Sequence, residues 1–165
     1  MYVLVGGWPA SGKSTLARAL GTELDLPCLG KDEVKEALMD ALGAPSTVEE
    51  SQTLGVAAVH AVLRIARGCP GAVIDSTWYD YSRPLVDRLP GPVVEVRCLA
   101  DRETVRTRYR SRLRDARHLD RARTEEELWG RPVAPLGVGP LVEVDTTRPV
   151  DVVSVATRIR TALSS

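Results

Sequence analysis

A glycine-rich segment near the start of the chain constrains the fold more than any other feature. Residues 7–14 read Gly-Trp-Pro-Ala-Ser-Gly-Lys-Ser and match the pattern G-x-x-x-x-G-K-[ST] at every defined position. An apolar run, residues 2–5, precedes the segment, and residues 13–24 follow with apolar side chains at helical spacing. The sequence therefore predicts a buried strand, a tight loop and a helix in succession. A plain glycine turn before a helix is the weaker alternative, because the whole pattern matches.

The predicted loop has the chemistry of a phosphate site. Glycines let the backbone wind so that several N–H groups point at one anion, and the N-terminus of the following helix adds positive potential. We expect Lys13 to bridge the β- and γ-phosphates of a nucleotide and the Ser14 hydroxyl to ligate Mg²⁺. The residues expected to contact the nucleotide here are Gly7, Pro9, Ala10, Ser11, Gly12, Lys13, Ser14 and Thr15.

Strand-like and helix-like segments alternate along the rest of the chain. Apolar runs that indicate further strands occur at residues 26–29, 71–75, 93–99 and 141–144. Helical spacing or helix-start signals occur at residues 32–42, 47–67, 82–89, 101–114 and 150–163. This alternation predicts an α/β fold, a parallel sheet with helices on both faces. We expect residues 1–165 to form a single domain, because no repeat or linker interrupts the pattern.

Composition excludes several classes of protein. Hydrophobic residues make up 44% of the chain, charged residues make up 27%, and 22 basic residues balance 22 acidic ones. These values are typical of a folded globular domain, and they argue against disorder and against a dedicated nucleic-acid binder. Three widely spaced cysteines indicate neither a disulfide framework nor a zinc site, which favours a cytoplasmic location. No window resembles a secretory leader or a membrane span, so we expect no membrane contact.

The sequence contains no asparagine, and this narrows the choice of nucleotide. Guanine-specific GTPases read their base with an Asn-Lys-x-Asp motif, and protein kinases need an asparagine in the catalytic loop. ATP is therefore expected in preference to GTP. Arg148 lies in a loop after the last predicted strand, where we expect it to contribute to nucleotide binding.

Two aspartates are expected beside the phosphate loop, because ligands bind at the carboxyl ends of parallel strands. Asp32 begins a predicted helix, where it is either the base that accepts the proton of an acceptor hydroxyl or a helix cap. Asp75 ends an apolar strand, where it either holds Mg²⁺, orients the substrate or stabilises a turn. Thr77 and Trp78 follow, and we expect both to join the two aspartates in substrate binding, although aromatic residues at such positions equally often pack in the interior.

Residues 97–123 carry the strongest charge asymmetry, with ten arginines against four acidic residues. On the predicted helix, Arg108 and Arg112 flank the apolar stripe. The arginines that lie further round the helix, and that we expect to be solvated or ion-paired, are Arg106, Arg110 and Arg114.

We expect residues 106–123 to form a lid from which Arg108 and Arg112 reach the phosphates, because the arginine fork binds phosphate oxygens bidentately. Two alternatives are a charged surface helix and an arginine-rich RNA contact.

The phosphate loop, the helix start at residues 31–36, the strand end at residues 73–77 and the Arg108-x-x-x-Arg112 pair together resemble the small P-loop kinases. This group includes zeta toxin, chloramphenicol phosphotransferase and polynucleotide kinase-like proteins, and its members are often described only as AAA-family ATP-binding proteins. The resemblance implies a nucleoside monophosphate kinase-like three-layer fold, with a five-stranded parallel sheet in the order 2-3-1-4-5 and an arginine-rich lid.

The same resemblance implies site residues and a reaction. Lys13, Ser14 and Thr15 would bind ATP and Mg²⁺, Asp32 would activate the acceptor hydroxyl, and Arg108 and Arg112 would be the lid arginines. The sequence departs from the adenylate kinases, which have a loop ending Gly-Lys-Gly-Thr and an Asp-Gly-Phe-Pro-Arg strand end. A small hydroxylated metabolite or antibiotic is therefore a better expected acceptor than a nucleoside monophosphate.

These observations lead to one hypothesis and two alternatives. The hypothesis is an ATP- and Mg²⁺-dependent kinase with catalytic residues Lys13, Asp32, Arg108 and Arg112, acting on a hydroxyl of a small molecule as a monomer or weak homodimer. One alternative is a polynucleotide 5′-hydroxyl or nucleotide kinase. The other is a regulatory protein that binds ATP, hydrolyses it slowly and contacts RNA or a protein partner through its arginine segment.

Overall fold

The structure is a computed structural model, and it describes residues 1–111, 115–119, 122–130 and 133–164. Within these residues one parallel sheet forms, in the strand order β2-β3-β1-β4-β5. Its strands are β1 (Tyr2–Gly7), β2 (Cys28–Gly30), β3 (Ala72–Asp75), β4 (Val93–Leu99) and β5 (Leu141–Asp145). The central strand β1 places Tyr2 opposite Ala72 of β3 and Val93 of β4. The predicted α/β class and the order 2-3-1-4-5 are confirmed.

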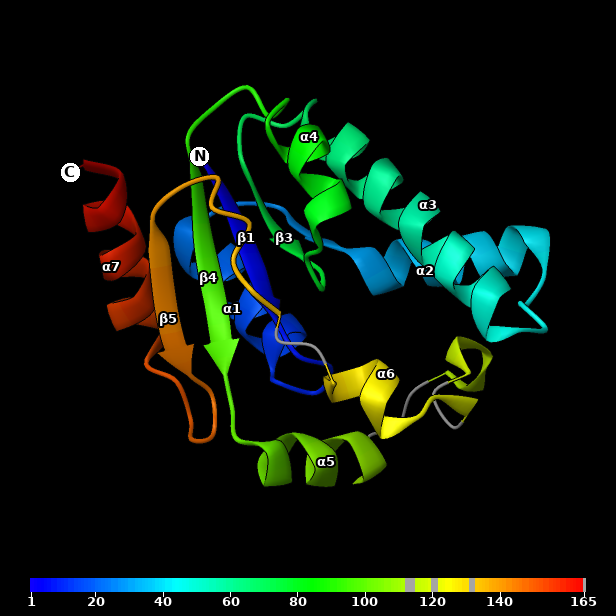
Figure 1. Cartoon of the computed structure of the whole chain (residues 1–165). Helices are drawn as coiled ribbons and strands as arrows, with labels where there is room; N and C mark the ends of the chain where they lie inside the picture. The colour runs from blue at the N-terminus through cyan, green and yellow to red at the C-terminus, as the bar shows by residue number, and fades with distance from the viewer. Residues whose placement is uncertain (112–114, 120–121, 131–132, 165) are drawn as a thin grey trace.

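Helices cover both faces of the sheet (Figure 1). One face carries α1 (Lys13–Leu24) and α7 (Val152–Ser164), and the other carries α3 (Val48–Ala66) and the short α4 (Arg83–Val86). The helix α2 (Lys31–Leu42) follows the edge strand β2 and packs along α3. The result is the expected three-layer sandwich.

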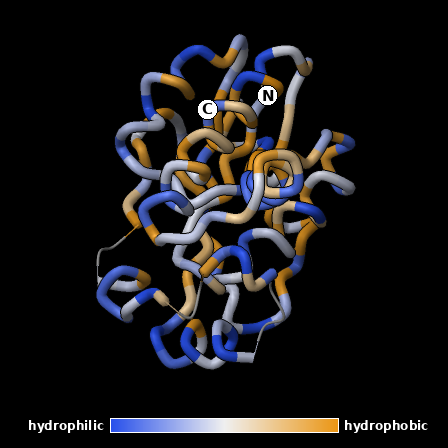
Figure 2. The backbone as a smooth tube through the Cα atoms, turned by 90° about the vertical axis from the view of Figure 1, so that its right-hand side faces the viewer, coloured by the Kyte–Doolittle hydropathy of each residue, from blue (hydrophilic) through white to orange (hydrophobic). Residues whose placement is uncertain are grey.

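A separate apolar cluster lies on each face of the sheet, between the strands and the helices that cover them. Val3, Val5 and Val73 point to the face covered by α1 and α7, where Leu16, Leu20 and Ile159 meet them. Tyr2, Leu4 and Ile74 point to the other face, because side chains alternate along a strand. Figure 2 shows the hydrophobic colour concentrated on interior segments and the hydrophilic colour mainly around the outside. Both faces of the central strands are buried, which explains their unbroken apolar sequence.

A third group of elements lies at the carboxyl ends of the strands, where the arrows of β4 and β5 point in Figure 1. It consists of α5 (Arg102–Ser111), the 3₁₀ turn η2 (Ala116–His118) and α6 (Glu125–Trp129). Val105, Leu128 and Trp129 form a small core here, and Trp8 and Tyr109 pack against it. The rings of Tyr109 and Trp129 meet edge to face, 5.3 Å apart. We call residues 102–129 the lid segment, of which 112–114 and 120–121 lie outside the described residues.

Most element boundaries follow from local chemistry. The predicted helix 47–67 is found as α3, and the Thr47 hydroxyl caps it by accepting a hydrogen bond from the Glu50 amide at 3.1 Å. The predicted helix 82–89 is shorter, since α4 ends at Val86 and Ser82 belongs to the preceding 3₁₀ turn η1 (Asp80–Ser82).

The sequence reasoning missed α6, although a signal for it exists. The Thr124 hydroxyl accepts from the Glu127 amide, and the Glu127 carboxylate accepts from the Thr124 amide. This reciprocal capping box is readable as Thr-x-x-Glu in the sequence.

None of the helices in the described part of the chain is long and apolar enough to cross a membrane.

Glu95 is a buried carboxylate that binds the backbone of the segment leading to β5. It lies within β4, and its two carboxylate oxygens accept from the backbone amides of Leu136 at 2.6 Å and Val138 at 2.9 Å. The charged side chain thereby satisfies two backbone donors, one buried and one partly buried, that would otherwise lose their partner.

We expect Glu95→Gln to lower the free energy of unfolding by about 1–3 kcal/mol, because the amide offers only one acceptor oxygen and leaves one buried N–H unpaired. Urea unfolding measures this change. Glu143→Gln is the matched control, since Glu143 is exposed and forms only a 3.5 Å ion pair with Arg97, and its effect should stay within about 0.5 kcal/mol. Equal losses in the two variants would contradict the structural role of Glu95.

Candidate active site

The segment between β1 and α1 folds as a loop around a point where several amides converge. Gly12 caps α1 in the left-handed region with φ 87°, and Ala10 has φ 63°. The first turn of α1 contains no acidic residue and no side-chain cap, so its amides remain available to an anion. Gly12 is needed at this position because a positive φ strains other residues. The backbone therefore has the geometry of a phosphate cradle.

The Lys13 side chain turns back across this loop. Its ammonium donates a hydrogen bond to the carbonyl of Trp8 at 2.8 Å. Desolvation by the surrounding protein lowers the pKa of Lys13 below its ordinary value, and the nearby carboxylate of Asp75 partly opposes this effect. A phosphate bound between the loop amides and the Lys13 ammonium would accept hydrogen bonds from both.

Asp75 ends β3 directly beside the loop. It is buried, and among the described residues its Oδ1 atom has no hydrogen-bond partner. Burial raises the pKa of Asp75, while Lys13 and a hydrogen bond with the Ser14 side chain act in the opposite direction. A hydroxyl and an orphaned carboxylate oxygen are ligands that Mg²⁺ accepts, so Ser14 and Asp75 fit the ion. No cluster of three or more metal-binding side chains occurs in the described part of the chain, so phosphate oxygens and water would complete the coordination.

The loop forms one end of a cleft of about 560 Å³. The other walls come from α2, α3, the segment after β3 and the lid segment. The lining residues that the sequence predicted for the site are Pro9, Ala10, Gly12, Lys13, Ser14, Thr15, Asp32, Asp75, Thr77 and Arg108. The structure thus brings the phosphate loop and both aspartates to one cavity.

Asp32 faces this cleft from the first turn of α2. The N-cap position of α2 is Gly30, and Asp32 lies in the first turn of the helix. Its carboxylate accepts from the Lys31 ammonium at 3.0 Å. Asp32 therefore does not occupy the N-cap position, and it is one of the residues that line the cleft.

Two described arginines of the lid segment, Arg108 and Arg123, line the cleft, and the contacts of Arg108 are the better defined. The Arg108 guanidinium donates to the carbonyls of Thr146 at 2.8 Å and Thr147 at 3.2 Å. The Thr146 hydroxyl in turn donates to the carbonyl of Ser11 in the phosphate loop at 2.6 Å. Arg108 therefore links the lid segment, the loop after β5 and the phosphate loop.

The other arginines of the lid segment behave differently. Arg106 and Arg110 both form ion pairs with Glu125 of α6, the latter at 3.7 Å, as expected for the outer side of the helix. Arg112 and Arg114 lie outside the described residues.

Four predicted site residues of the described part of the chain do not line the cleft. Trp78 is the clearest correction: it is buried in the core under α3, and its indole N–H donates to the carbonyl of Val5 at 3.1 Å. A ring of this size buries more apolar area in the core than it could at the cleft edge. Gly7 and Ser11 line a second cavity, behind the loop, and Arg148 is exposed outside both cavities.

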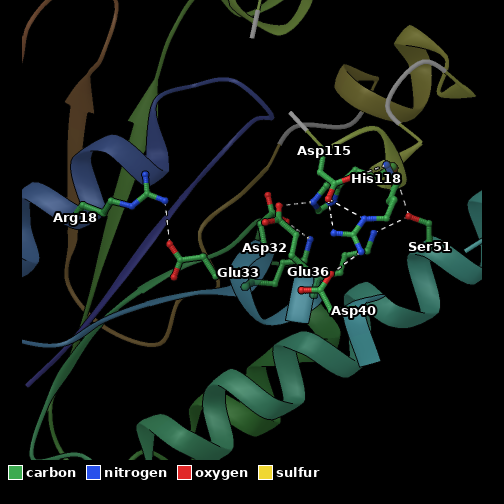
Figure 3. Close-up of polar contacts among 11 residues, drawn as sticks. Arg18, Asp32, Glu33, Glu36, Asp40, Ser51, Asp115 and His118 are labelled. Carbon is green, nitrogen blue, oxygen red and sulfur yellow. Dashed lines mark hydrogen bonds and ion pairs between the residues drawn. The ribbon is translucent and has the colours of Figure 1, made fainter. Parts of the chain in front are cut away.

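The structure also brings to the cleft residues that are outside the predicted set of site residues. Lys31, Lys35 and Ser51 line the cleft. His118 also lines it, and this buried side chain contacts Glu36 of α2 through Nε2 at 2.8 Å. Figure 3 shows Glu36 and His118 together, with Ser51 beside them on α3.

A second contact fastens the same part of the lid segment to α2. The Arg117 guanidinium pairs with Asp115 at 2.6 Å and with Asp40 at 2.7 Å. This contact holds the pKa of Asp115 at about 2. The contacts of Arg117 with Asp40 and of His118 with Glu36 join residues that are distant in sequence, so no local pattern could predict them.

We expect the pH dependence of stability to reveal the environment of Lys13. The folded protein holds the Lys13 proton less tightly than the unfolded chain does. The contribution of Lys13 to the free energy of unfolding should therefore increase as the pH rises. The rise should occur between its lowered pKa and 10.5. Urea unfolding of wild type and Lys13→Met from about pH 8 to 11 measures it, as a difference between the two proteins that grows in favour of wild type. A constant difference would contradict the lowered pKa.

Curated relatives match part of the chain. Uncharacterized proteins of Mycobacterium bovis and Mycobacterium tuberculosis are 33% identical to it over 112 residues, which cover 59% of this chain and 22% of theirs. The chain therefore spans about a fifth of the length of these relatives.

Solved structures match nearly the whole chain. A protein of Chloroflexus aurantiacus described as a "putative kinase" superposes with a TM-score of 0.83 at 29% identity, covering 98% of this chain and 97% of that one. A gluconokinase from Sinorhizobium meliloti superposes with a TM-score of 0.65 at 20% identity, covering 99% and 94%. At this lower identity the second match shows the fold alone.

The family comparison covers the site itself. Residues 3–129 match the family described as an AAA domain, a range that includes the phosphate loop, both aspartates of the cleft and Arg108. Together with the parallel sheet and the loop between β1 and α1, this match shows that the chain belongs to the AAA domain family of P-loop proteins.

Proposed function

We propose that the protein is an ATP- and Mg²⁺-dependent kinase that transfers the γ-phosphoryl group to a hydroxyl of a small molecule. The observation that carries this proposal is the shared cleft. Lys13, Asp75 and Asp32 all line it. A cavity of about 560 Å³ has the size of a small-molecule site. The neighbour that is 29% identical is also described as a kinase.

The nucleotide would be held by the chain as follows. The amides at the start of α1 and the Lys13 ammonium would bind the β- and γ-phosphates, and Arg108 would lie beside them over Gly12. Ser14 and Asp75 would hold Mg²⁺, which when bound neutralises charge on the phosphate oxygens. The lysine would exchange its present contact with the Trp8 carbonyl for the phosphates.

Asp32 would act on the acceptor. Its carboxylate would accept the hydroxyl proton while the acceptor oxygen bonds to the γ-phosphorus and the bond to the ADP oxygen breaks. The products would be ADP and a phosphate ester. The lid segment, which borders the cleft through Arg108, Tyr109 and His118, would exclude water from this reaction.

The regulatory alternative receives little support from the arginines. Arg106, Arg110 and Arg117 are engaged by Glu125, Asp115 and Asp40. An RNA contact would require these arginines to give up acidic partners for phosphates.

The decisive experiment is a screen of small polyols, sugars and hydroxy acids with Mg-ATP. We expect ADP release together with a product heavier by one phosphoryl group by mass spectrometry, and neither with Lys13→Met. Asp32→Asn should lower kcat by about 10²–10⁴, because the general base is lost, with the affinity for Mg-ATP unchanged in calorimetry.

Glu33→Gln is the matched control for Asp32→Asn. Glu33 is the next residue of α2, but its side chain is exposed and pairs with Arg18 outside the cleft. Its kcat should equal that of wild type. A wild-type kcat in Asp32→Asn would remove Asp32 from the reaction, and ADP formed without a phosphorylated product would favour the regulatory alternative.

The lid arginines give a second test. Arg108→Ala should lower kcat/KM for ATP by roughly 10–100-fold, the amount expected for a lost hydrogen bond to a charged group. Arg110→Ala removes an arginine two positions away that pairs with Glu125 and does not line the cleft, and it should change kcat/KM by less than about threefold. Steady-state kinetics on both variants measures this, and equal losses would contradict the assignment of Arg108.

A further inference from the structure

Aromatic side chains are scarce in this chain, and the structure divides them into two groups. The sequence contains four tyrosines, three tryptophans and no phenylalanine. Five of these rings are buried in an apolar cluster or packed against one, and they are Tyr2, Trp8, Trp78, Tyr109 and Trp129. The other two, Tyr79 and Tyr81, lie outside the apolar clusters of the described residues, and both line the active-site cleft. These two rings therefore need an explanation other than core packing.

The two tyrosines lie together and keep much of their surface in solvent. Tyr79 is 50% exposed and Tyr81 is 42% exposed. Their ring centroids are 6.3 Å apart and their planes differ by 23°, so the rings are nearly parallel. Single exposed apolar side chains are ordinary, but neighbouring ones gathered in a cleft indicate a binding surface. An aromatic face of this kind favours a planar ring that can stack on it.

The backbone on both sides of the two tyrosines is fixed in the interior. Trp78 precedes them, and its buried indole donates to the carbonyl of Val5 at 3.1 Å. Ser82 follows them and is also buried, and its hydroxyl donates to the carbonyl of Tyr79 at 2.6 Å. We call residues 79–81 the tyrosine turn. Because the turn is held at both ends, a ligand that binds to it need not order the backbone first, which lowers the entropic cost of binding.

The register of the sheet relates the tyrosine turn to the proposed base. Gly30 at the end of β2 pairs with Asp75 at the end of β3. Asp32 follows Gly30 closely and Tyr79 follows Asp75 closely, so both come from adjacent strand ends at the same edge of the sheet. The phosphate loop follows β1, on the other side of β3, and β5 lies farther away still. The turn therefore lies on the Asp32 side of the phosphate loop, away from the loop after β5.

Helix α3 adds apolar surface to the same cleft. Val56 and Val59 are three residues apart, so they lie on one face of the helix, and both line the cleft. Val59 is buried in the same apolar cluster as Trp78, so α3 and the segment leading to the tyrosine turn share one core. Val56 is exposed. An exposed valine suits an apolar part of a ligand better than the hydroxyl groups of a polyol.

We infer that Tyr79, Tyr81 and Val56 form a subsite for a planar aromatic ring of the acceptor. The acceptor hydroxyl lies at Asp32 when the ring is bound there. This inference rests on the proposed kinase function and narrows the substrate class to alcohols that carry an aromatic ring. In the reaction the acceptor oxygen bonds to the γ-phosphorus, the bond from that phosphorus to the ADP oxygen breaks, and Asp32 takes the hydroxyl proton. The ring stays stacked and does not react.

The test compares probes that differ in their ring. Phenylethanediol carries a planar ring, cyclohexylethanediol carries a puckered ring of similar size, and propanediol carries none. Each is added to the full chain filled with Mg²⁺ and a non-hydrolysable ATP analogue, and its dissociation constant is measured by ligand-observed NMR. We expect the phenyl probe to bind about tenfold tighter than propanediol and about threefold tighter than the cyclohexyl probe. Uridine against methyl riboside is a second pair, which shows whether the subsite takes a nucleobase as well as a phenyl ring.

Variants locate the effect. Tyr79→Leu and Tyr81→Leu remove an aromatic face but keep an apolar side chain, and each should weaken binding of the phenyl probe by about threefold. The double leucine variant should lose the preference for the phenyl over the cyclohexyl probe, whereas Tyr79→Phe and Tyr81→Phe should keep it. Leu42→Ser is the control, since Leu42 is an exposed apolar residue of α2 that does not line the cleft. Thermal unfolding and the heat of Mg-ATP binding show that each variant is folded and still binds the nucleotide.

The outcomes separate this inference from the kinase proposal. A phenyl probe that binds no tighter than the cyclohexyl probe, or not at all, overturns the subsite, and so do leucine variants that keep the wild-type preference. Phosphorylation of ringless polyols by Mg-ATP would then leave the kinase standing. Ring binding that requires the two tyrosines, with no phosphoryl transfer from Mg-ATP to any probe, would keep the subsite and reject the kinase.

Discussion

The site depends on two opposite charges held in the interior at the ends of neighbouring strands. Asp75 pairs in register with Val5 on the central strand, and Lys13 begins the helix that follows that strand. Burial disfavours the charged form of both groups, and each partly stabilises the other. The sheet can hold them because its central strands are buried on both faces and therefore rigid. A triphosphate and its metal ion would supply the charges that this arrangement lacks.

The two halves of the cleft come from different parts of the chain. The half that would bind the nucleotide is built from β1, α1 and the loop after β5, which are tied together by Thr146 and Arg108. The half that would take the acceptor is built from α2, which follows the edge strand β2, and from α3, which covers one face of the sheet (Figure 1). Under the proposed function, substitutions on α2 and α3 would alter the choice of acceptor without disturbing the phosphate loop.

The sequence predicted the parts of this structure that are local. The phosphate loop was readable because its glycines and lysine have fixed spacing, and α1 has the bounds expected from its apolar periodicity. Trp78 was misplaced because a strand end predicts which edge a residue lies at but not whether its side chain turns inward. The pairing of His118 with Glu36 joins residues 82 positions apart, and only the folded chain brings them together. Lys35 was overlooked because a single lysine on a predicted helix normally faces solvent.

The tryptophan inside the phosphate loop has a mechanical consequence. Trp8 packs against the lid core formed by Val105, Leu128 and Trp129, and the Trp129 indole lies 3.5 Å from the carbonyl of Pro9 in the same loop. The loop and the lid segment thus share one small apolar core. If a bound anion displaces the backbone of the phosphate loop, this small core must repack. Binding in the phosphate loop would therefore change the position of the lid segment through steric contact. The fluorescence of Trp8 and Trp129, which both lie in this core, would report that repacking.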